Sequence, residues 1–175
     1  LERARLPEAW FDLAIGNVPF AQHAPHDPVH NRAGFSLHNY AIFKAAHLTR
    51  PGGYLALVVM SRFTWWETFY FFFKGKPKEA LRRQRRSAVM ARLDVDTFVP
   101  TWYYGPSELG DLLPGYAIKE CRPIGFWLPP SYLDPFFVKR HKWLRLLEWL
   151  EKKSAARCLA PAADHYYLLL QKKQI

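Results

Sequence analysis

The chain has 175 residues, about the size of one ordinary domain, and half of them are hydrophobic and 17% aromatic. This composition excludes extensive disorder and allows one buried core, so we expect a single domain over residues 1–175. Lysine and arginine number 25 against 15 aspartate and glutamate, a net charge of +10. Such an excess favours nucleic acid, an anionic membrane surface or an anionic small molecule as partner.

The cysteine content and the N-terminal sequence bear on the cellular compartment. Cys121 and Cys158 are far apart and predict neither a disulfide framework nor a Cys-x-x-Cys metal site, so we expect a reducing cytoplasmic compartment. Residues 1–5 lack the apolar stretch of a signal peptide and do not begin with Met, so we expect them to come from within a longer protein. The longest nearly apolar run, residues 63–73, is too short to span a bilayer.

The first part of the chain has the pattern of strand, loop, helix and strand. Residues 11–17 are a short apolar run closed by a glycine and a polar residue, which is typical of a buried parallel strand that reaches its loop. Residues 18–35 hold three prolines and follow no period, which predicts a long loop at the carboxyl end of that strand. Ser36 is placed to cap a helix that ends at residues 51–53, and residues 54–60 form a second buried strand. The expected apolar face of the helix consists of Leu37, Tyr40, Ala41, Ala45 and Leu48.

A strand, a helix and a second strand in this order predict an α/β fold with a right-handed crossover. The rest of the chain adds further elements of both kinds. We expect an aromatic helix or cover at 65–74, a basic helix at 77–93, a short helix capped by Ser107 and ending near 114–115, a strand at 116–123, a long basic amphipathic helix at 135–153 and a last strand at 165–171.

The segment Asn17-Val18-Pro19-Phe20 directly follows the first buried strand, the place where open α/β sheets hold their ligands. It resembles the motif of the amino-methyltransferases in the class I, S-adenosylmethionine-dependent superfamily, Asn/Asp/Ser-Pro-Pro-Tyr/Phe/Trp. Val18 replaces the first proline of that motif. The replacement is compatible with the resemblance because this position contributes chiefly its backbone carbonyl.

The resemblance gives each residue of this segment a role. An exocyclic amine conjugated to a purine ring is a poor nucleophile, so its hydrogens must be held by acceptors that direct the nitrogen lone pair at the methyl donor. Asn17 and the carbonyl of Val18 would be those acceptors, Phe20 would stack on the extruded base, and Pro19 would fix the turn. The alternative is a strand-ending turn with an apolar plug. The strand before the segment, and the helix stop and strand after it, favour the methyltransferase interpretation.

Further sequences widen the resemblance. Residues 11–53 contain His26-Asp27-Pro28, Phe35-Ser36-Leu37-His38-Asn39-Tyr40 and Arg50-Pro51-Gly52-Gly53, and with these they resemble adenine-N6 DNA methylases fused to helicases in large phage and plasmid proteins. A second set of short sequences lies in residues 51–175: Ser61-Arg62, Trp66-Glu67, the basic segment 78–86, Pro106-Ser107-Glu108-Leu109, Leu128-Pro129-Pro130 and Asp164-His165-Tyr166. Through these sequences, residues 51–175 resemble the C-terminal half of small-molecule methyltransferases of the ubiquinone/menaquinone type.

Both resemblances imply the C-terminal half of a Rossmann-like class I methyltransferase sheet. Residues 11–17 would be strand four, 54–60 strand five, and 116–123 with 165–171 the closing antiparallel pair, strands six and seven. Such enzymes bind S-adenosylmethionine through a Gly-rich loop after strand one and an acidic residue after strand two, and the chain has no Gly-x-Gly. We therefore expect an N-terminally truncated methyltransferase domain with an incomplete cofactor site.

The same expectation concerns the edge of the sheet. Strand four normally lies in mid-sheet beside strand one, and without that neighbour its unpaired backbone groups face water. We expect self-association or a partner chain that supplies the missing strands.

Two clusters of polar side chains have more than one interpretation. Arg82, Arg83, Arg85 and Arg86 are candidate contacts to the phosphates of DNA, and a solvated helix face or docking on an anionic membrane surface are the alternatives. The histidines His23, His26, His30, His38 and His47 lie in or near the proline-containing loop. We expect them to be solvated, and we predict no metal site.

The segment at 65–73 holds more aromatic side chains than one helix needs for packing: Trp65, Trp66, Phe69, Tyr70, Phe72 and Phe73. A core or an active-site cover is the favoured interpretation, and an interfacial helix that brings in a lipid-like substrate is the competitor. Glu67 and the pair Asp164-His165 are interpreted as structural because no nucleophile motif or metal set accompanies them.

Three functions remain open from the sequence. The first is methyl transfer to adenine N6 in DNA, carried by residues 17–20. The second is a small-molecule, quinone or lipid methyltransferase that uses the aromatic segment as a lid. The third is an inactive or designed binding module that keeps the fold without the cofactor loop.

Overall fold

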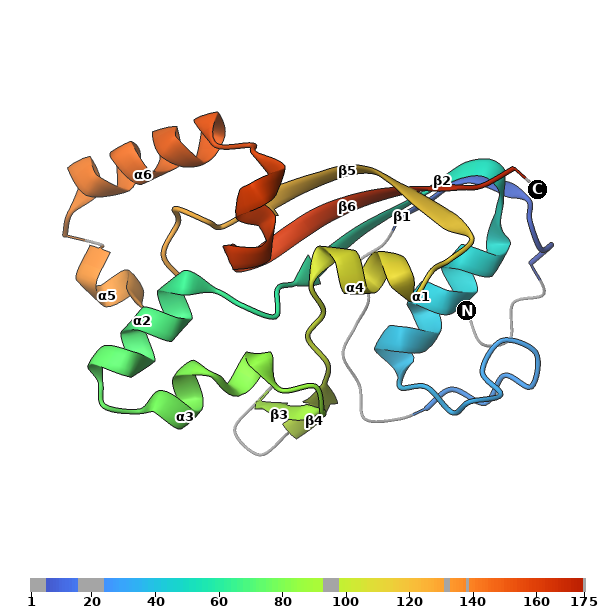
Figure 1. The fold of residues 1–175 in the computed structure, drawn as a ribbon, viewed down its shortest axis with the longest axis horizontal. Coiled ribbons are helices and arrows are strands. Elements are labelled where there is room, and N and C mark those ends of the chain that lie inside the picture. The colour runs from blue at the N-terminus through green and yellow to red at the C-terminus, as the bar shows by residue number, and fades with distance from the viewer. Residues whose placement is uncertain (1–5, 16–23, 93–97, 131–132, 138, 175) are drawn as a thin grey trace.

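The computed structural model describes residues 6–15, 24–92, 98–130, 133–137 and 139–174 (Figure 1). Two short 3₁₀ helices are labelled η1 and η3. In chain order the elements are β1 (Phe11–Ile15), α1 (Leu37–Leu48), β2 (Thr49–Met60), α2 (Trp65–Phe73), α3 (Pro77–Ala80), η1 (Arg82–Gln84), β3 (Val89–Arg92), β4 (Phe98–Thr101), α4 (Pro106–Asp111), β5 (Tyr116–Ile124), α5 (Asp134–Phe137), α6 (His141–Lys153), η3 (Arg157–Ala162) and β6 (His165–Lys172). The chain is therefore α/β. None of its described helices has the length and apolar character needed to cross a bilayer.

Four strands form one sheet in the order β1-β2-β6-β5. β1 and β2 run parallel, with Leu13 opposite Tyr54, and α1 is the crossover between them. β6 runs antiparallel to both of its neighbours, so that Leu168 lies opposite Leu57 on β2 and Cys121 on β5. The predicted antiparallel pairing of residues 116–123 with 165–171 is confirmed.

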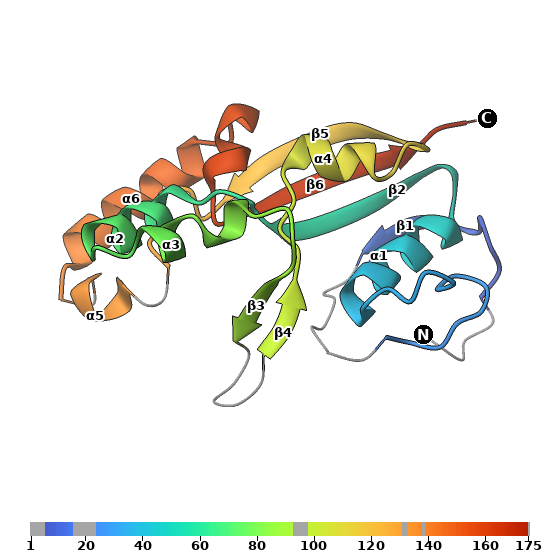
Figure 2. The ribbon, with the colours of Figure 1, turned by 60° about the horizontal axis from the view of Figure 1, so that its bottom comes forward.

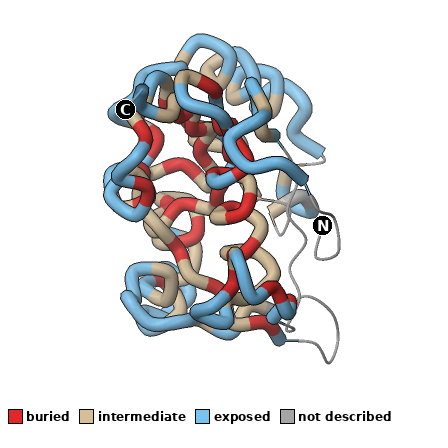
Figure 3. Tube along the Cα trace, turned by 90° about the vertical axis from the view of Figure 1, so that its right-hand side faces the viewer, coloured by how far each residue is buried: buried red, intermediate tan, exposed pale blue. Residues whose placement is uncertain are grey.

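The core lies on one face of this sheet, under α1, α4 and η3. Alternate residues of each strand enter it because successive side chains of a strand point to opposite faces. The contributing residues of β2 and β6 are Leu55, Leu57, Val59, Tyr166, Leu168 and Leu170. The helices add Ile42 and Ala46 from α1 and Leu109 from α4. Figure 3 shows these buried stretches in the interior of the trace, with exposed segments around them.

The opposite face of the sheet is open at β1 and β2. The side chains of Leu13, Ile15 and Val58 are 51%, 73% and 56% exposed. Within the described part of the chain, β1 has β2 as its only strand neighbour, so its outer edge has no ladder partner there. This geometry matches the edge expected from the sequence.

The prediction of a basic helix over 77–93 is wrong. α3 ends at Ala80, η1 follows, and residues 89–92 form β3, which pairs antiparallel with β4. The helix ends because the chain turns Arg82 and Arg83 inward to the buried carboxylate of Glu67, a tertiary contact that outweighs local helix propensity. Figure 2 shows β3 and β4 projecting away from the four-stranded sheet.

Two further helix predictions need correction. Gly105, and not Ser107, precedes α4: Pro106 takes the first helical position, and the Glu108 carboxylate accepts the backbone N–H of Gly105 at 2.8 Å. The long helix expected at 135–153 is divided into α5 and α6. Arg140 contributes to the division because its guanidinium donates to the carbonyl of Phe136 at 2.7 Å, which satisfies an end of α5.

α1 and β2 also differ from the prediction in detail. The buried side chains of α1 include Ile42, Lys44 and Ala46, whereas Ala41 and Ala45 are half-buried, because the helix is covered both by the sheet and by the preceding loop. β2 begins at Thr49 and includes the Pro-Gly-Gly sequence that was expected to precede it. Gly53 makes this possible, since a Cβ there would lie 2.9 Å from the carbonyl oxygen of Phe11 on β1.

Candidate functional site

The predicted motif Asn17-Val18-Pro19-Phe20 lies outside the described residues. The described chain reaches it from both sides in the sequence. β1 ends at Ile15, at the carboxyl end of a parallel strand pair, and the chain is described again from Ala24 until it enters α1. We call the described residues on either side of the segment, the end of β1 and the loop from Ala24 to α1, the frame of the site.

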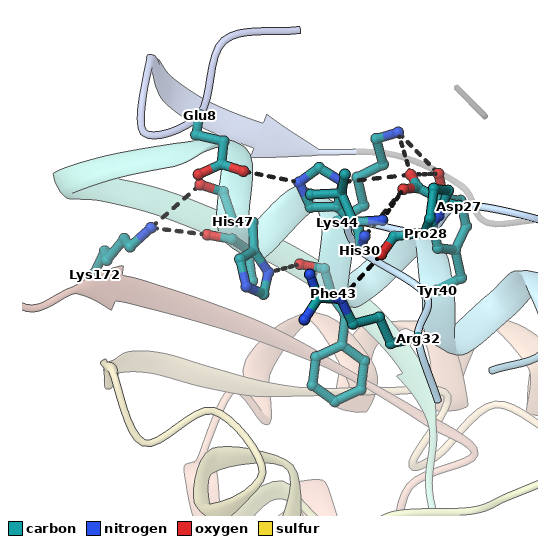
Figure 4. A network of polar contacts seen from close by, with 12 residues as sticks. Glu8, Asp27, Pro28, His30, Arg32, Tyr40, Phe43, Lys44, His47 and Lys172 are labelled. Carbon is teal, nitrogen blue, oxygen red and sulfur yellow. Dashed lines mark hydrogen bonds and ion pairs between the residues drawn. The ribbon is translucent and has the colours of Figure 1, made fainter. Parts of the chain in front are cut away.

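Asp27 is the centre of that frame (Figure 4). Its Oδ1 accepts the backbone N–H groups of Val29 and His30, each at 3.0 Å. Its Oδ2 accepts the Tyr40 hydroxyl at 2.8 Å and the Lys44 ammonium at 2.9 Å. Lys44 also donates to the Tyr40 oxygen at 2.9 Å, which closes a triangle of polar groups between the loop and α1.

The triangle is an ion pair sheltered from water. The side chains of Asp27 and Lys44 are 7% and 4% exposed. The backbone N–H of His30 and the Lys44 ammonium hold the pKa of Asp27 well below its usual range. Burial opposes the charge of Lys44, but its hydrogen bonds to Tyr40 and Asp27 outweigh burial and raise the pKa of the ammonium. Both groups are therefore charged over the whole physiological pH range.

Asn31 is the second anchor of the same loop. Its side-chain amide donates to the carbonyls of Pro25 at 2.8 Å and Phe35 at 3.1 Å, and its side-chain oxygen accepts the backbone N–H of Phe35 at 2.7 Å. The backbone N–H of Asn31 donates to the carbonyl of Asp27 at 2.8 Å. With Asp27 and Asn31 both buried, residues 25–35 are held by side-chain to backbone hydrogen bonds in the absence of a helix or strand.

His30 ties this loop to the segment before β1. Its Nε2 lies 3.3 Å from the Glu8 carboxylate and its Nδ1 lies 3.3 Å from Asp27. The backbone N–H groups of Ala9 and Trp10 donate to the end of α1, at the carbonyls of His47 and Leu48. The chain is thus fixed to α1 both before β1 and after the segment that follows β1.

Lys172, at the end of β6, completes the support of α1. Its ammonium donates to the carbonyl of Ala46 in the last turn of α1 at 3.1 Å, where helical carbonyls lack partners within the helix, and to the carbonyl of Thr49 at the start of β2 at 2.7 Å. A cation at this end also complements the helix dipole. Burial lowers the pKa of this ammonium.

A pocket of about 140 Å³ lies beside the frame, between α1 and α4. It is lined by Phe35, Asn39, Ile42, Phe43, Tyr104, Leu109, Leu112 and Leu113. Phe35 and Phe43 are stacked, with ring centroids 4.8 Å apart and an interplanar angle of 9°. Asn39 hydrogen-bonds the side chain of Tyr104, so the polar groups of the lining are already in contact with each other. The pocket suits an apolar group better than a charged one.

The four arginines predicted to contact anions, residues 82, 83, 85 and 86, form two pairs with different surroundings. Glu67 is 2% exposed and binds Arg82 Nε at 2.7 Å and Arg83 Nη2 at 2.6 Å. Arg83 also contacts Asp164 at 3.2 Å. Arg85 and Arg86 are exposed on the surface. Glu67 and Asp164 therefore lie in ion pairs, and Arg85 and Arg86 are the members of the cluster on the open surface.

The sequence itself contains a signal for the Asp27 triangle. Lys44 lies four residues after Tyr40, so the two share one side of α1, and that side was expected to be apolar. A lysine there needs a buried acid, and His26-Asp27-Pro28 in the preceding loop contains one.

A scan with protein-family models and a search of curated proteins found no match to the chain.

Proposed function

We propose that the chain is the acceptor-side half of a class I methyltransferase and that it presents an exocyclic amine, adenine N6 in DNA, for methylation. The observation that carries the proposal is the position of Asn17-Val18-Pro19-Phe20 directly after β1, the parallel strand that pairs with β2. Open α/β sheets hold ligands at the carboxyl ends of such strands. The antiparallel pairing of β6 with β5, beside the parallel pair of β1 and β2, agrees with the closing antiparallel pair that the resemblance implies.

The residues of this chain would act by holding and orienting the amine. Asn17 and the carbonyl of Val18 accept its two hydrogens, which leaves the nitrogen lone pair free and fixes its direction. Phe20 stacks on the base, and Pro19 limits the conformations of the turn. This work needs a rigid support, and the loop held by Asp27 and Asn31, which follows the segment in the sequence, would supply one.

S-adenosylmethionine would supply an electrophilic methyl group, but the sequence lacks the Gly-x-Gly loop through which the resemblance implies that it binds. Neither β1 nor β2 is followed by a Gly-x-Gly sequence, and the residues directly after them include no carboxylate that could hold ribose hydroxyls. The proposal therefore assigns to this chain the acceptor side alone. A second chain or copy that pairs with the open edge of β1 would complete the sheet.

The apolar pocket between α1 and α4 favours a second candidate, methylation of a small hydrophobic molecule such as a quinone or lipid. Its lining is almost entirely apolar, with Phe35 and Phe43 already stacked. No residue of the aromatic helix α2, which is described throughout, lines this pocket, and α2 lies away from α1 (Figure 1), so this candidate does not use α2 as a lid.

The test compares wild type with Asn17→Ala. Purified protein is titrated by calorimetry with an adenine-containing oligonucleotide and, separately, with a hydroxyquinone, because binding of the acceptor is the part of the reaction that the proposal assigns to this chain. We expect tighter binding of this oligonucleotide than of one with unsubstituted purine in place of adenine, and we expect Asn17→Ala to lose this preference with an unchanged circular dichroism spectrum. Asn31→Ala tests the support of the segment, and we expect weaker binding together with lower stability. Binding of the quinone alone would favour the second candidate, and a folded, monodisperse sample that binds neither acceptor would refute both.

A further inference from the structure

A row of large apolar side chains runs along the outer side of α6. Trp143, Leu146 and Trp149 are 61%, 45% and 56% exposed. Each follows the previous one by three residues, so they lie next to one another along the helix surface. The inner side of α6 is fixed by Glu151, whose carboxylate accepts the backbone N–H groups of Gly125 and Trp127, each at 2.8 Å. The row therefore faces away from the rest of the protein.

Positive charge surrounds this row. The exposed cations of α6 and the two residues before it are Lys139, Arg140, Lys142, Arg145, Lys152 and Lys153. The acids in the same stretch are Glu148, which is exposed, and Glu151, which is engaged on the inner side. The apolar row is thus flanked by cations at both ends of α6 and has the exposed Arg145 and Glu148 along its length.

Further exposed aromatic side chains lie outside α6, at the same end of the molecule. Phe136 on α5 is 55% exposed, and the guanidinium of Arg140 lies over its ring at 3.8 Å. Phe72 and Phe73 at the end of α2 are 64% and 83% exposed. Figures 1 and 2 both place α2, α3, α5 and α6 together at this end, away from β1 and α1.

We propose that this end of the molecule docks on an anionic lipid surface, with α6 lying in the headgroup region. Trp143, Leu146 and Trp149 enter the boundary between headgroups and acyl chains, and the flanking lysines and arginines contact lipid phosphates. Tryptophan and leucine on one side of a basic helix are the composition that binds this boundary. In water, by contrast, the row leaves three large apolar side chains exposed together.

The charge and shape of the α6 surface fit a lipid surface better than nucleic acid, the other anionic partner. A nucleic-acid strand would use the same cations and would stack its bases on aromatic rings. In α6, however, the aliphatic Leu146 lies between the two tryptophans, and the row is continuous along the helix. A continuous apolar row is complementary to acyl chains. The docking surface is independent of the residues that carry the proposed methyl transfer.

The test is co-sedimentation of the purified chain with vesicles of phosphatidylcholine alone or mixed with phosphatidylglycerol. We expect binding to the mixed vesicles and little to the neutral ones. The double variant Trp143→Ala/Trp149→Ala should lower the partition coefficient more than about tenfold, because two buried indoles are lost. Trp10→Ala is the matched control, since Trp10 is 67% exposed and lies in the segment before β1.

A pair of lysine variants measures the electrostatic contribution to vesicle binding. Lys152→Gln should weaken binding about fivefold, whereas Lys119→Gln, an exposed lysine on β5, should leave it unchanged. Equal binding to neutral and anionic vesicles would overturn the proposal, and so would equal losses in the Trp10 and Trp143/Trp149 variants. Oligonucleotide binding that the double variant abolishes, without vesicle binding by wild type, would assign the surface to nucleic acid instead.

Discussion

Replacing Lys44 by methionine tests whether the Asp27 triangle holds the loop after β1. Methionine keeps most of the length of the side chain and removes the ammonium that donates to Asp27 and Tyr40 at 2.9 Å. Because the two side chains of the ion pair are 4% and 7% exposed, water cannot readily replace the lost donor. Breaking a buried pair by removing one partner costs about 3 to 5 kcal/mol. Asp27 keeps three other donors, so we expect a loss of about 3 kcal/mol in the free energy of unfolding.

The assay is urea denaturation followed by far-ultraviolet circular dichroism, with Lys78→Met as the control because Lys78 is exposed on α3. A double-mutant cycle with Asp27→Asn isolates the interaction, and we expect a coupling energy of at least about 1 kcal/mol. The reasoning fails if Lys44→Met costs less than about 1 kcal/mol, the contribution of an exposed pair. It also fails if the two substitutions are additive.

Three further outcomes follow from the described contacts. Because the pKa of Asp27 is lowered in the folded chain, stability should be fully present above about pH 4 and fall in more acidic solution, and Asp27→Asn should flatten this part of a urea-denaturation pH profile. Glu67→Gln should cost about 2 kcal/mol in the same assay, less than a fully buried pair because Arg82 is partly exposed, and Glu79→Gln is its surface control; an equal effect of the two would contradict a structural role for Glu67. Gly34→Ala should cost about 1 kcal/mol through backbone strain alone, since φ is +65° and an added Cβ meets no atom within 4 Å; an unchanged urea midpoint would argue against the left-handed conformation.

The strands of the main sheet were predictable from the sequence because β2 and β6 contain apolar runs of ordinary strand length and β5 follows the turn signal at residues 114–115. Residues 54–60, 116–123 and 165–171 all lie within observed strands. The early start of β2 was not predictable, since a Pro-Gly-Gly sequence reads as a turn. It forms a strand because Gly53 lets β1 approach closely, a contact between segments far apart in the sequence.

The site was less accessible to sequence reasoning than the sheet. Asp27 and Lys44 are 17 residues apart, and their pairing depends on how the loop folds back on α1. The fate of Arg82 and Arg83 likewise depended on Glu67, which lies on a different helix. A run of arginines predicts an exposed basic surface, but one buried carboxylate nearby is enough to draw two of them inward.

The position of β6 determines when the molecule can be assembled during synthesis. β6, residues 165–172, lies between β2 and β5 in the sheet. Neither β2 nor β5 therefore has its full set of backbone partners before β6 has left the ribosome. Until then β2 has an unpaired, apolar edge that other nascent chains can contact. We therefore expect the chain to depend most on chaperones during that interval.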